Sequence, residues 1–125
     1  MILLLDTHAL LWWFAEDPKL TGPARRSIAD PANDVLVSAA SMWEIEVKRA
    51  AGRLDAPLDL LGAVASAGFD AIPFTAQDAV DAARLPNHHG DPFDRMVIAQ
   101  ARRFEAVIVS HDRAFAAYDV HVLGV

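Results

Sequence analysis

The chain has 125 residues, of which 54% are hydrophobic and 22% charged, a balance that predicts one compact domain over residues 1–125 and excludes a largely disordered chain. It contains no cysteine, which excludes disulfides, thiolate zinc sites and a thiol nucleophile. Seventeen acidic residues against eleven basic ones give a formal net charge of -6, which disfavours non-specific binding to nucleic acid unless bound cations offset the acids locally.

Short apolar runs alternate with helical segments along the sequence. The run at residues 2–5 is wholly apolar, which is typical of a strand buried on both faces of a sheet. Pairs such as Asp17-Pro18 and Asp30-Pro31 separate the segments. In chain order the sequence predicts a strand at 2–5, helices at 9–15 and 22–29, a strand at 35–37, helices at 39–50 and 58–67, a strand at 69–74, helices at 76–84 and 92–104, a strand at 107–109, a short turn after Asp112 and a strand at 120–125.

This alternation predicts an α/β fold with three layers, α/β/α and Rossmann-like, around a central parallel sheet of about five strands. The longest unbroken apolar run, at 9–15, has seven residues, whereas a membrane-spanning helix needs about 18 to 20. The first residues carry no basic leader and are interrupted by Asp6, which does not fit a secretory signal. We therefore expect a cytoplasmic protein with no membrane segment.

Two acidic residues follow predicted strands. Asp6 comes directly after the first strand, and Asp112 follows the strand at 107–109 after Ser110 and His111. Ligands of open parallel sheets bind beyond the carboxyl ends of the strands, so both acids are candidates for a functional site. Each acid also suits the N-cap of the next helix, and the sequence leaves both roles open.

A third acid lies near the start of the helix predicted at 92–104. Asp91 fits its N-cap and Pro92 its first helical position. At about 100° per residue, Asp94 falls on the buried side of this helix. A buried carboxylate needs a cation, hydrogen-bond donors or an opening to a cleft, although an acid here also fits the capping of the first turn.

A fourth acid comes from the helix predicted at 39–50, where Glu44 and Glu46 flank the apolar stripe on opposite sides. The spacing of Ser41 and Glu44 also fits a capping box. Periodicity does not choose between the two glutamates.

Parallel packing can bring these four segments to one edge of the sheet. Ionised carboxylates at close range repel and raise one another's pKa unless a cation is present. Ligand sets made only of oxygen suit Mg²⁺ or Mn²⁺. Such an ion can bind a phosphodiester and activate water, so the set predicts metal-assisted phosphodiester hydrolysis.

The same segments resemble the PIN-domain ribonucleases and, among them, the VapC-type toxins of type II toxin-antitoxin systems. The matching stretches are LLLDTH at 3–8, SAASMWEI at 38–45, DPFDRM at 91–96 with IAQA at 98–101, and VSHD at 109–112 followed by Phe115. Their order and spacing cover nearly the whole chain.

The resemblance implies a PIN-like domain that acts as a Mg²⁺- or Mn²⁺-dependent endoribonuclease, in which metal-activated water hydrolyses RNA phosphodiesters. It favours Glu44 over Glu46 and Asp94 over Asp91. It also implies a homodimer and a cognate VapB-like antitoxin as partners. The implied catalytic residues and metal ligands are Asp6, Glu44, Asp94 and Asp112, of which Asp112 is the position that varies most in the family.

Four neighbours of these acids are candidates for supporting roles. Thr7 and Ser110 stand beside acids and are expected to orient carboxylates, although turn or capping roles fit equally. Arg95 and Arg113 each follow a proposed ligand, and their guanidinium groups suit RNA phosphates. A salt bridge to an acid is the more common role for such arginines.

The sequence does not assign a single role to the histidines and tryptophans. Solvation in a loop is the expected state of His88 and His89, while His111, beside Asp112, is near enough to touch a substrate. The helix predicted at 9–15 is apolar on all sides, so Trp12 and Trp13 fit either the core or a protein interface.

One reading from a different class competes with the nuclease. In it, the chain is a non-catalytic, protein-binding α/β domain whose acids are only helix caps. It predicts no metal binding, and it predicts that neutralising the acids changes nothing beyond stability.

Overall fold

The structure is a computed structural model that describes residues 1–124, apart from the side chain of Arg113. It contains a five-stranded sheet with the order β3-β2-β1-β4-β5, in which all neighbouring strands are parallel. The strands are β1 (Ile2–Leu5), β2 (Asp34–Ser38), β3 (Asp70–Ile72), β4 (Val107–Ser110) and β5 (Val122–Gly124). The predicted parallel α/β architecture is confirmed.

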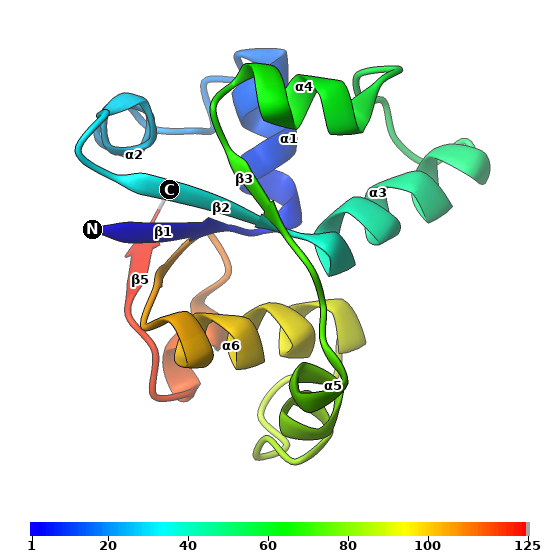
Figure 1. Ribbon diagram of the computed structural model, residues 1–125, viewed down its shortest axis with the longest axis vertical. Helices are drawn as coiled ribbons and strands as arrows, with labels where there is room; N and C mark the ends of the chain where they lie inside the picture. Colours follow the sequence, from blue (N-terminus) through cyan, green and yellow to red (C-terminus); the bar gives the residue numbers. More distant parts are fainter. Residues whose placement is uncertain (125) are drawn as a thin grey trace.

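Helices cover both faces of this sheet. Figure 1 shows α1, α2 and α4 on one side, α5 and α6 on the other, and α3 extending from the end of β2. Their bounds are α1 (Thr7–Ala15), α2 (Gly22–Ala29), α3 (Ala39–Ala50), α4 (Leu60–Ser66), α5 (Ala76–Ala83) and α6 (Pro92–Phe104), with a 3₁₀ helix η1 (Arg113–Ala117) after β4. None of the helices in the described part of the chain has the length and apolar character needed to span a bilayer.

The alternation of side chains along β1 divides the core in two. Leu3 and Leu5 point to the cluster that receives α1, α2 and α4, whereas Leu4 points to the cluster beneath α6. All three leucines are fully buried. Because successive residues of a strand face opposite sides, a run that is apolar at every position fits only a strand covered on both faces.

Several predicted boundaries are wrong by one or two residues for identifiable reasons. Helix α1 begins at Thr7 because Asp6 is its N-cap and accepts a hydrogen bond from the amide of Ala9. Strand β3 begins after Phe69, whose amide donates to the carbonyl of Val64 instead, and it ends before Pro73, which has no amide hydrogen to donate.

The remaining differences are small. Helix α4 starts after the cap Asp59 rather than at Leu58, and α5 ends one residue early, at Ala83. The last strand is shorter than the predicted 120–125, since Val120 bonds in a turn to Tyr118, and Val125 lies outside the described residues. Helices α2, α3 and α6 have the predicted bounds.

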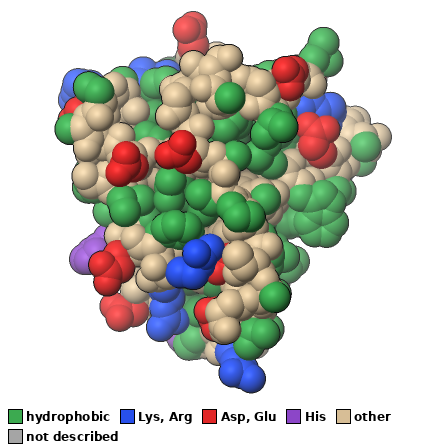
Figure 2. Space-filling view, in the orientation of Figure 1, with side chains coloured by type: hydrophobic (Ala, Val, Ile, Leu, Met, Phe, Trp, Pro, Cys, Tyr) green, Lys and Arg blue, Asp and Glu red, His purple; other side chains and the backbone are tan. Residues whose placement is uncertain are grey.

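Charged and apolar side chains are intermixed on one broad face of the molecule. Figure 2 shows hydrophobic side chains across the middle of this face, over the region of β3, with acidic and basic side chains scattered around them. The net charge of -6 is therefore not gathered into one patch on this face.

A buried carboxylate joins α5 to α6. Asp78 is fully buried and forms a capping box with Thr75 at the start of α5. It accepts two hydrogen bonds from Arg103 of α6, at 2.7 and 2.9 Å, and one from Gln100. Burial raises the pKa of Asp78, but the hydrogen bonds from Arg103, Thr75 and Gln100 outweigh it and lower the pKa to about 2.

We expect Asp78→Asn to lower the free energy of unfolding by about 1–3 kcal/mol, the cost of losing charged hydrogen bonds. Because the folded pKa lies below the ordinary aspartate value of 3.8, this contribution is present above about pH 4 and is lost as the pH falls toward 2. Urea unfolding at neutral and acidic pH measures both effects. Asp81→Asn on the same helix is the matched control, since the side chain of Asp81 accepts a hydrogen bond from Gln77 at the surface. An equal loss of stability in Asp81→Asn would contradict the stabilising role given to the buried hydrogen bonds of Asp78.

Candidate active site

The acids gather where the strands end. The carboxyl ends of β1, β2 and β4 lie side by side, since Leu5 pairs with Val37 on one side and with Val109 on the other. Helices α1 and α3 begin directly after β1 and β2, and in Figure 1 α6 begins at the same edge of the sheet. A cleft of about 350 Å³ opens there. It is lined by Asp6, Thr7, His8, Glu44, Lys48, Asp91, Asp94, His111 and Asp112.

Asp6 is held at the floor of this cleft by two different donors. One carboxylate oxygen accepts from the amide of Ala9, at 2.7 Å, and so caps α1. The other accepts from the hydroxyl of Ser110, at 2.5 Å. That hydroxyl in turn accepts from the amide of Asp112, at 2.9 Å, which leaves its hydrogen directed at Asp6. Asp6 therefore serves as a helix cap and as part of the cleft at once.

Glu44 reaches the cleft from the second turn of α3 and is 4% exposed. Its two oxygens accept from the hydroxyl of Thr7, at 2.5 Å, and from Lys48, at 2.6 Å. The helix is capped by Ser38, not by the predicted Ser41, so the carboxylate of Glu44 is not used in a capping box. Thr7 and Ser110 thus each donate to one of the acids.

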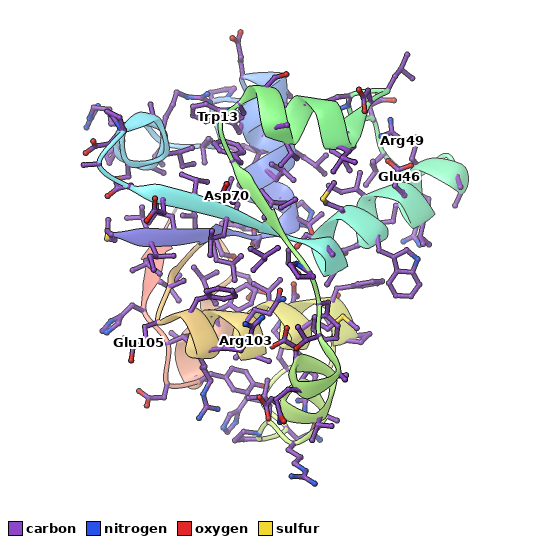
Figure 3. The ribbon with its side chains drawn as sticks, in the orientation of Figure 1. Trp13, Glu46, Arg49, Asp70, Arg103 and Glu105 are labelled. Atoms are coloured by element: carbon purple, nitrogen blue, oxygen red, sulfur yellow. The ribbon has the colours of Figure 1, made fainter. Side chains whose placement is uncertain are left out.

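Glu46 lies elsewhere. It is exposed and pairs with Arg49 at 2.9 Å. Figure 3 shows Glu46 and Arg49 close together beside α3 and the segment that leads to α4. Arg49 also donates to the carbonyls of Ala56 and Pro57 in that segment. The structure therefore separates the two glutamates that periodicity left equivalent.

Asp94 and Asp112 meet at a histidine. The Nε2 atom of His89 lies 2.9 Å from Asp94 Oδ2 and 3.0 Å from Asp112 Oδ2. Asp112 uses its other oxygen to cap η1 through the amide of Ala114. The expectation that His89 is simply a solvated loop residue is wrong: the side chain is only 15% exposed. His88 is exposed, as expected.

The hydrogen bonds of His89 indicate which of its nitrogens carries the proton. Nδ1 accepts from the amide of Asp91, at 3.1 Å, so it carries no hydrogen, and the neutral ring has its hydrogen on Nε2. An N–H group donates and does not ligate a metal. The donor set His89, Asp94 and Asp112 is compact enough for an ion, but in this arrangement His89 draws the two carboxylates together as a hydrogen-bond donor.

Arg95 and Tyr118 hold the loop that carries His89. The terminal nitrogens of Arg95 donate to the carbonyls of Ala82, Ala83, Leu85, Pro86 and His89, at 2.9 to 3.4 Å. The hydroxyl of Tyr118 accepts from the amides of His88 and His89 and donates to Pro86. Arg95 is thereby directed at backbone carbonyls at the end of α5 rather than at the cleft, which corrects both expectations for it, the phosphate contact and the salt bridge. The phosphate contact predicted for Arg113 falls on a side chain outside the described part of the structure.

The electrostatics of the cleft show an excess of negative charge. Burial raises the pKa of Asp6 despite the bonds from Ser110 and Ala9. Burial, with the charges of Asp91, Asp6 and Glu44, raises the pKa of Asp94 to about 7, although His89 opposes the change. For Asp112 burial acts in the same upward direction, but the bonds from Ala114 and His89 outweigh it and lower the pKa. A cation between these acids would stabilise the ionised forms of Asp6 and Asp94 and lower their pKa values.

Sequence reasoning missed His8 and Lys48, which line this cleft, and the contacts of His89 with two of its acids. The position of Lys48 four residues after Glu44, on the same face of α3, was a readable signal for their pairing. The role of His89 had a weaker signal, because it depends on the three-dimensional path of the loop before α6.

A family model described as PIN domain matches residues 3–120 of the chain. The chain belongs to the PIN-domain family. One relative, Ribonuclease VapC22 of Mycobacterium tuberculosis (strain ATCC 25618 / H37Rv), is 28% identical over 118 residues, which make up 92% of this chain and 90% of the relative.

Solved structures of low sequence identity share this PIN fold. A chain of VapBC2 from Rickettsia felis, bound to a DNA fragment from its promoter, matches with a TM-score of 0.72 at 14% identity, over 99% of this chain and 98% of that one. A chain of DNA-bound VapBC from Salmonella typhimurium matches with a TM-score of 0.71 at 16% identity, again over 99% and 98% of the two chains.

We expect Asp94→Asn to raise the free energy of unfolding in the presence of chelator at about pH 8, by on the order of 1–3 kcal/mol. The folded pKa of about 7 lies above the ordinary aspartate value of 3.8, so the unfolded chain ionises first and wild-type stability falls as the pH rises between these values. Denaturant unfolding at about pH 4 and pH 8 measures the change.

Asp70→Asn is the control for this prediction, because Asp70 is exposed at the start of β3, beside the middle of β2 (Figure 3), and does not line the cleft. It should leave the pH dependence unchanged. A loss of stability in Asp94→Asn at the higher pH would show that the carboxylate is not under electrostatic strain.

Proposed function

We propose that this PIN-domain protein is a divalent-metal-dependent endoribonuclease of the VapC type. The observation that carries the proposal is the convergence of four carboxylates, from four separate segments, on one cleft at the carboxyl edge of the sheet. The name of the relative, Ribonuclease VapC22, supports RNA as the substrate. The proposed catalytic residues and metal ligands are Asp6, Glu44, Asp94 and Asp112.

The cleft has the chemistry of a site for Mg²⁺ or Mn²⁺. Its acids offer oxygen ligands, which these ions prefer, and the raised pKa values of Asp6 and Asp94 mark a place where positive charge is lacking. When bound, the ion would lower the pKa of water and stabilise negative charge on the phosphate oxygens.

The protein's own groups position the acids for this task. Ser110 and the amide of Ala9 fix the two oxygens of Asp6, and Thr7 with Lys48 fixes those of Glu44. Such supporting hydrogen bonds set the direction of the ligand lone pairs. The Nε2–H group of His89 keeps Asp94 near Asp112, so that two acids from different elements face the same point.

We also propose a protein partner of the VapB antitoxin type and a homodimer. The related solved structures are described as VapBC complexes. On α3, Trp43 is 58% exposed and Val47 45% exposed, one turn apart, and Leu61 of α4 is 63% exposed. Large exposed apolar side chains of this kind are common at protein interfaces. Co-expression with an antitoxin of this type should therefore yield a complex that elutes as one species.

The decisive test compares RNA cleavage by wild type, Asp94→Asn and Glu44→Gln with Mg²⁺ or Mn²⁺ and then with chelator. We expect the wild type to cut RNA only with the ion, and both variants to lose at least about 100-fold in kcat/KM, or more than about 2.7 kcal/mol of transition-state stabilisation. Glu46→Gln is the matched control, since it makes the same chemical change on the same helix outside the cleft, and it should cut like the wild type.

Two results would contradict the proposal. If calorimetry detects no binding of either ion to the wild-type protein and no RNA is cut, the cleft is not a metal centre and the protein-binding domain is the correct reading. If Glu46→Gln loses as much activity as Glu44→Gln, the proposal that the cleft is the catalytic site is wrong.

A further inference from the structure

Three aromatic rings form a patch on the rim of the acidic cleft. His8 and Trp12 come from α1 and His111 from the segment after β4. The ring centres of Trp12 and His111 are 5.0 Å apart, those of His8 and His111 5.6 Å, and those of His8 and Trp12 5.9 Å. Each ring therefore contacts the other two. We call these three residues the aromatic patch.

The aromatic patch is both anchored and accessible. Trp12 is partly buried and packs against the core cluster beneath α1, which fixes its indole. The imidazoles of His8 and His111 are exposed, and both line the cleft beside Asp6 and Asp112. Rings held in place before binding lose little conformational freedom when a flat group stacks on them.

Two basic side chains near the cleft, among those that the structure describes, are engaged in other contacts. Lys48 is paired with Glu44, and Arg95 donates to backbone carbonyls. The cleft is acidic and the net charge of the chain is -6, so attraction to phosphates cannot supply much affinity at this place. Stacking on a nucleobase does not depend on the sign of the surrounding charge.

We propose that the aromatic patch binds a nucleobase of single-stranded RNA by stacking, next to the acids that face its phosphodiester. The ammonium group of Lys19, 5.9 Å from the centre of the Trp12 ring, supplies a positive charge beside it. This inference rests on the proposed function and adds the place beside the cleft where a base of the RNA is held. Paired RNA hides its base faces and does not fit this patch.

The test measures binding rather than cleavage. Chelator is present throughout, and the fluorescence anisotropy of an end-labelled probe follows the titration of two probes, a single-stranded RNA of about six nucleotides and an abasic ribose-phosphate strand of the same length. Both probes carry the same phosphates, so their difference in affinity isolates the bases. We expect the RNA to bind more tightly than the abasic strand, with a ratio that changes little between about 50 and 200 mM salt.

Trp12→Leu should lower the affinity for the RNA by about 5- to 150-fold, the loss of about 1–3 kcal/mol of stacking, and leave the abasic strand unchanged. Trp12→Phe should keep most of the affinity. His8→Ala and His111→Ala alter exposed side chains and so preserve folding, and each should reduce the ratio of the two affinities. The matched control is Trp43→Leu, which removes an exposed indole that does not line the cleft.

Equal binding of the two probes to the wild type would overturn the proposal, as would wild-type RNA affinity in His8→Ala, His111→Ala and Trp12→Leu. If these variants still cleave RNA with wild-type KM, the ribonuclease function stands and only the stacking site fails. If they lose antitoxin binding instead, the aromatic patch is a protein-binding surface and the proposal is wrong. A higher KM at nearly constant kcat supports it.

Discussion

Mutual repulsion among the carboxylates of the cleft is the constraint on which the arrangement of the surrounding structure depends. Three parallel strands end at one edge of the sheet, and the segments that follow them place Asp6, Glu44 and Asp112 there, while the first turn of α6 adds Asp94. Burial raises the pKa of Asp6, and burial together with neighbouring acids raises that of Asp94 to about 7. Such a cluster lowers the stability of the fold that carries it. Its presence is therefore better explained by a ligand that needs it than by capping alone.

Hydrogen-bond donors from several different elements bind these carboxylates and offset their mutual repulsion. Asp6 and Asp112 each use one oxygen to cap the helix that follows and turn the other toward the cleft. His89 faces two acids at once, and its loop is fastened by Arg95 and Tyr118. These contacts explain why Arg95, although it follows the proposed ligand Asp94, does not point into the cleft. Arg95 satisfies carbonyls at the end of α5, groups that a helix terminus leaves without partners, and in doing so it fixes the position of His89.

Much of the fold and part of the site could be predicted from the sequence. A wholly apolar run of four residues is typical of a strand covered on both faces, so the run at 2–5 predicted β1, and Asp91-Pro92 predicted the start of α6. Capping and lining a cleft were offered as competing roles for Asp6, yet the structure shows both, because a carboxylate has two oxygens. Glu44 and Glu46 differ by two positions on one helix, and only the placement of α3 against α1 and α6 separates them. His89 was misjudged because its contacts span 23 positions along the chain, a distance that local patterns do not encode.

The acidity of the cleft also limits how a substrate can be held. A nuclease centre that depends on cations must be rich in carboxylates, and each carboxylate weakens the attraction of the same surface for phosphates. A broad basic surface close to the centre would bind the acids first, as Lys48 binds Glu44 and Arg103 binds Asp78. Rings such as His8, Trp12 and His111 avoid this competition, because the proposed contact with a base would come from flat apolar area and not from charge. In the proposed nuclease, their place beside Asp6 and Asp112 would let substrate binding and metal chemistry share one small cleft without cancelling each other.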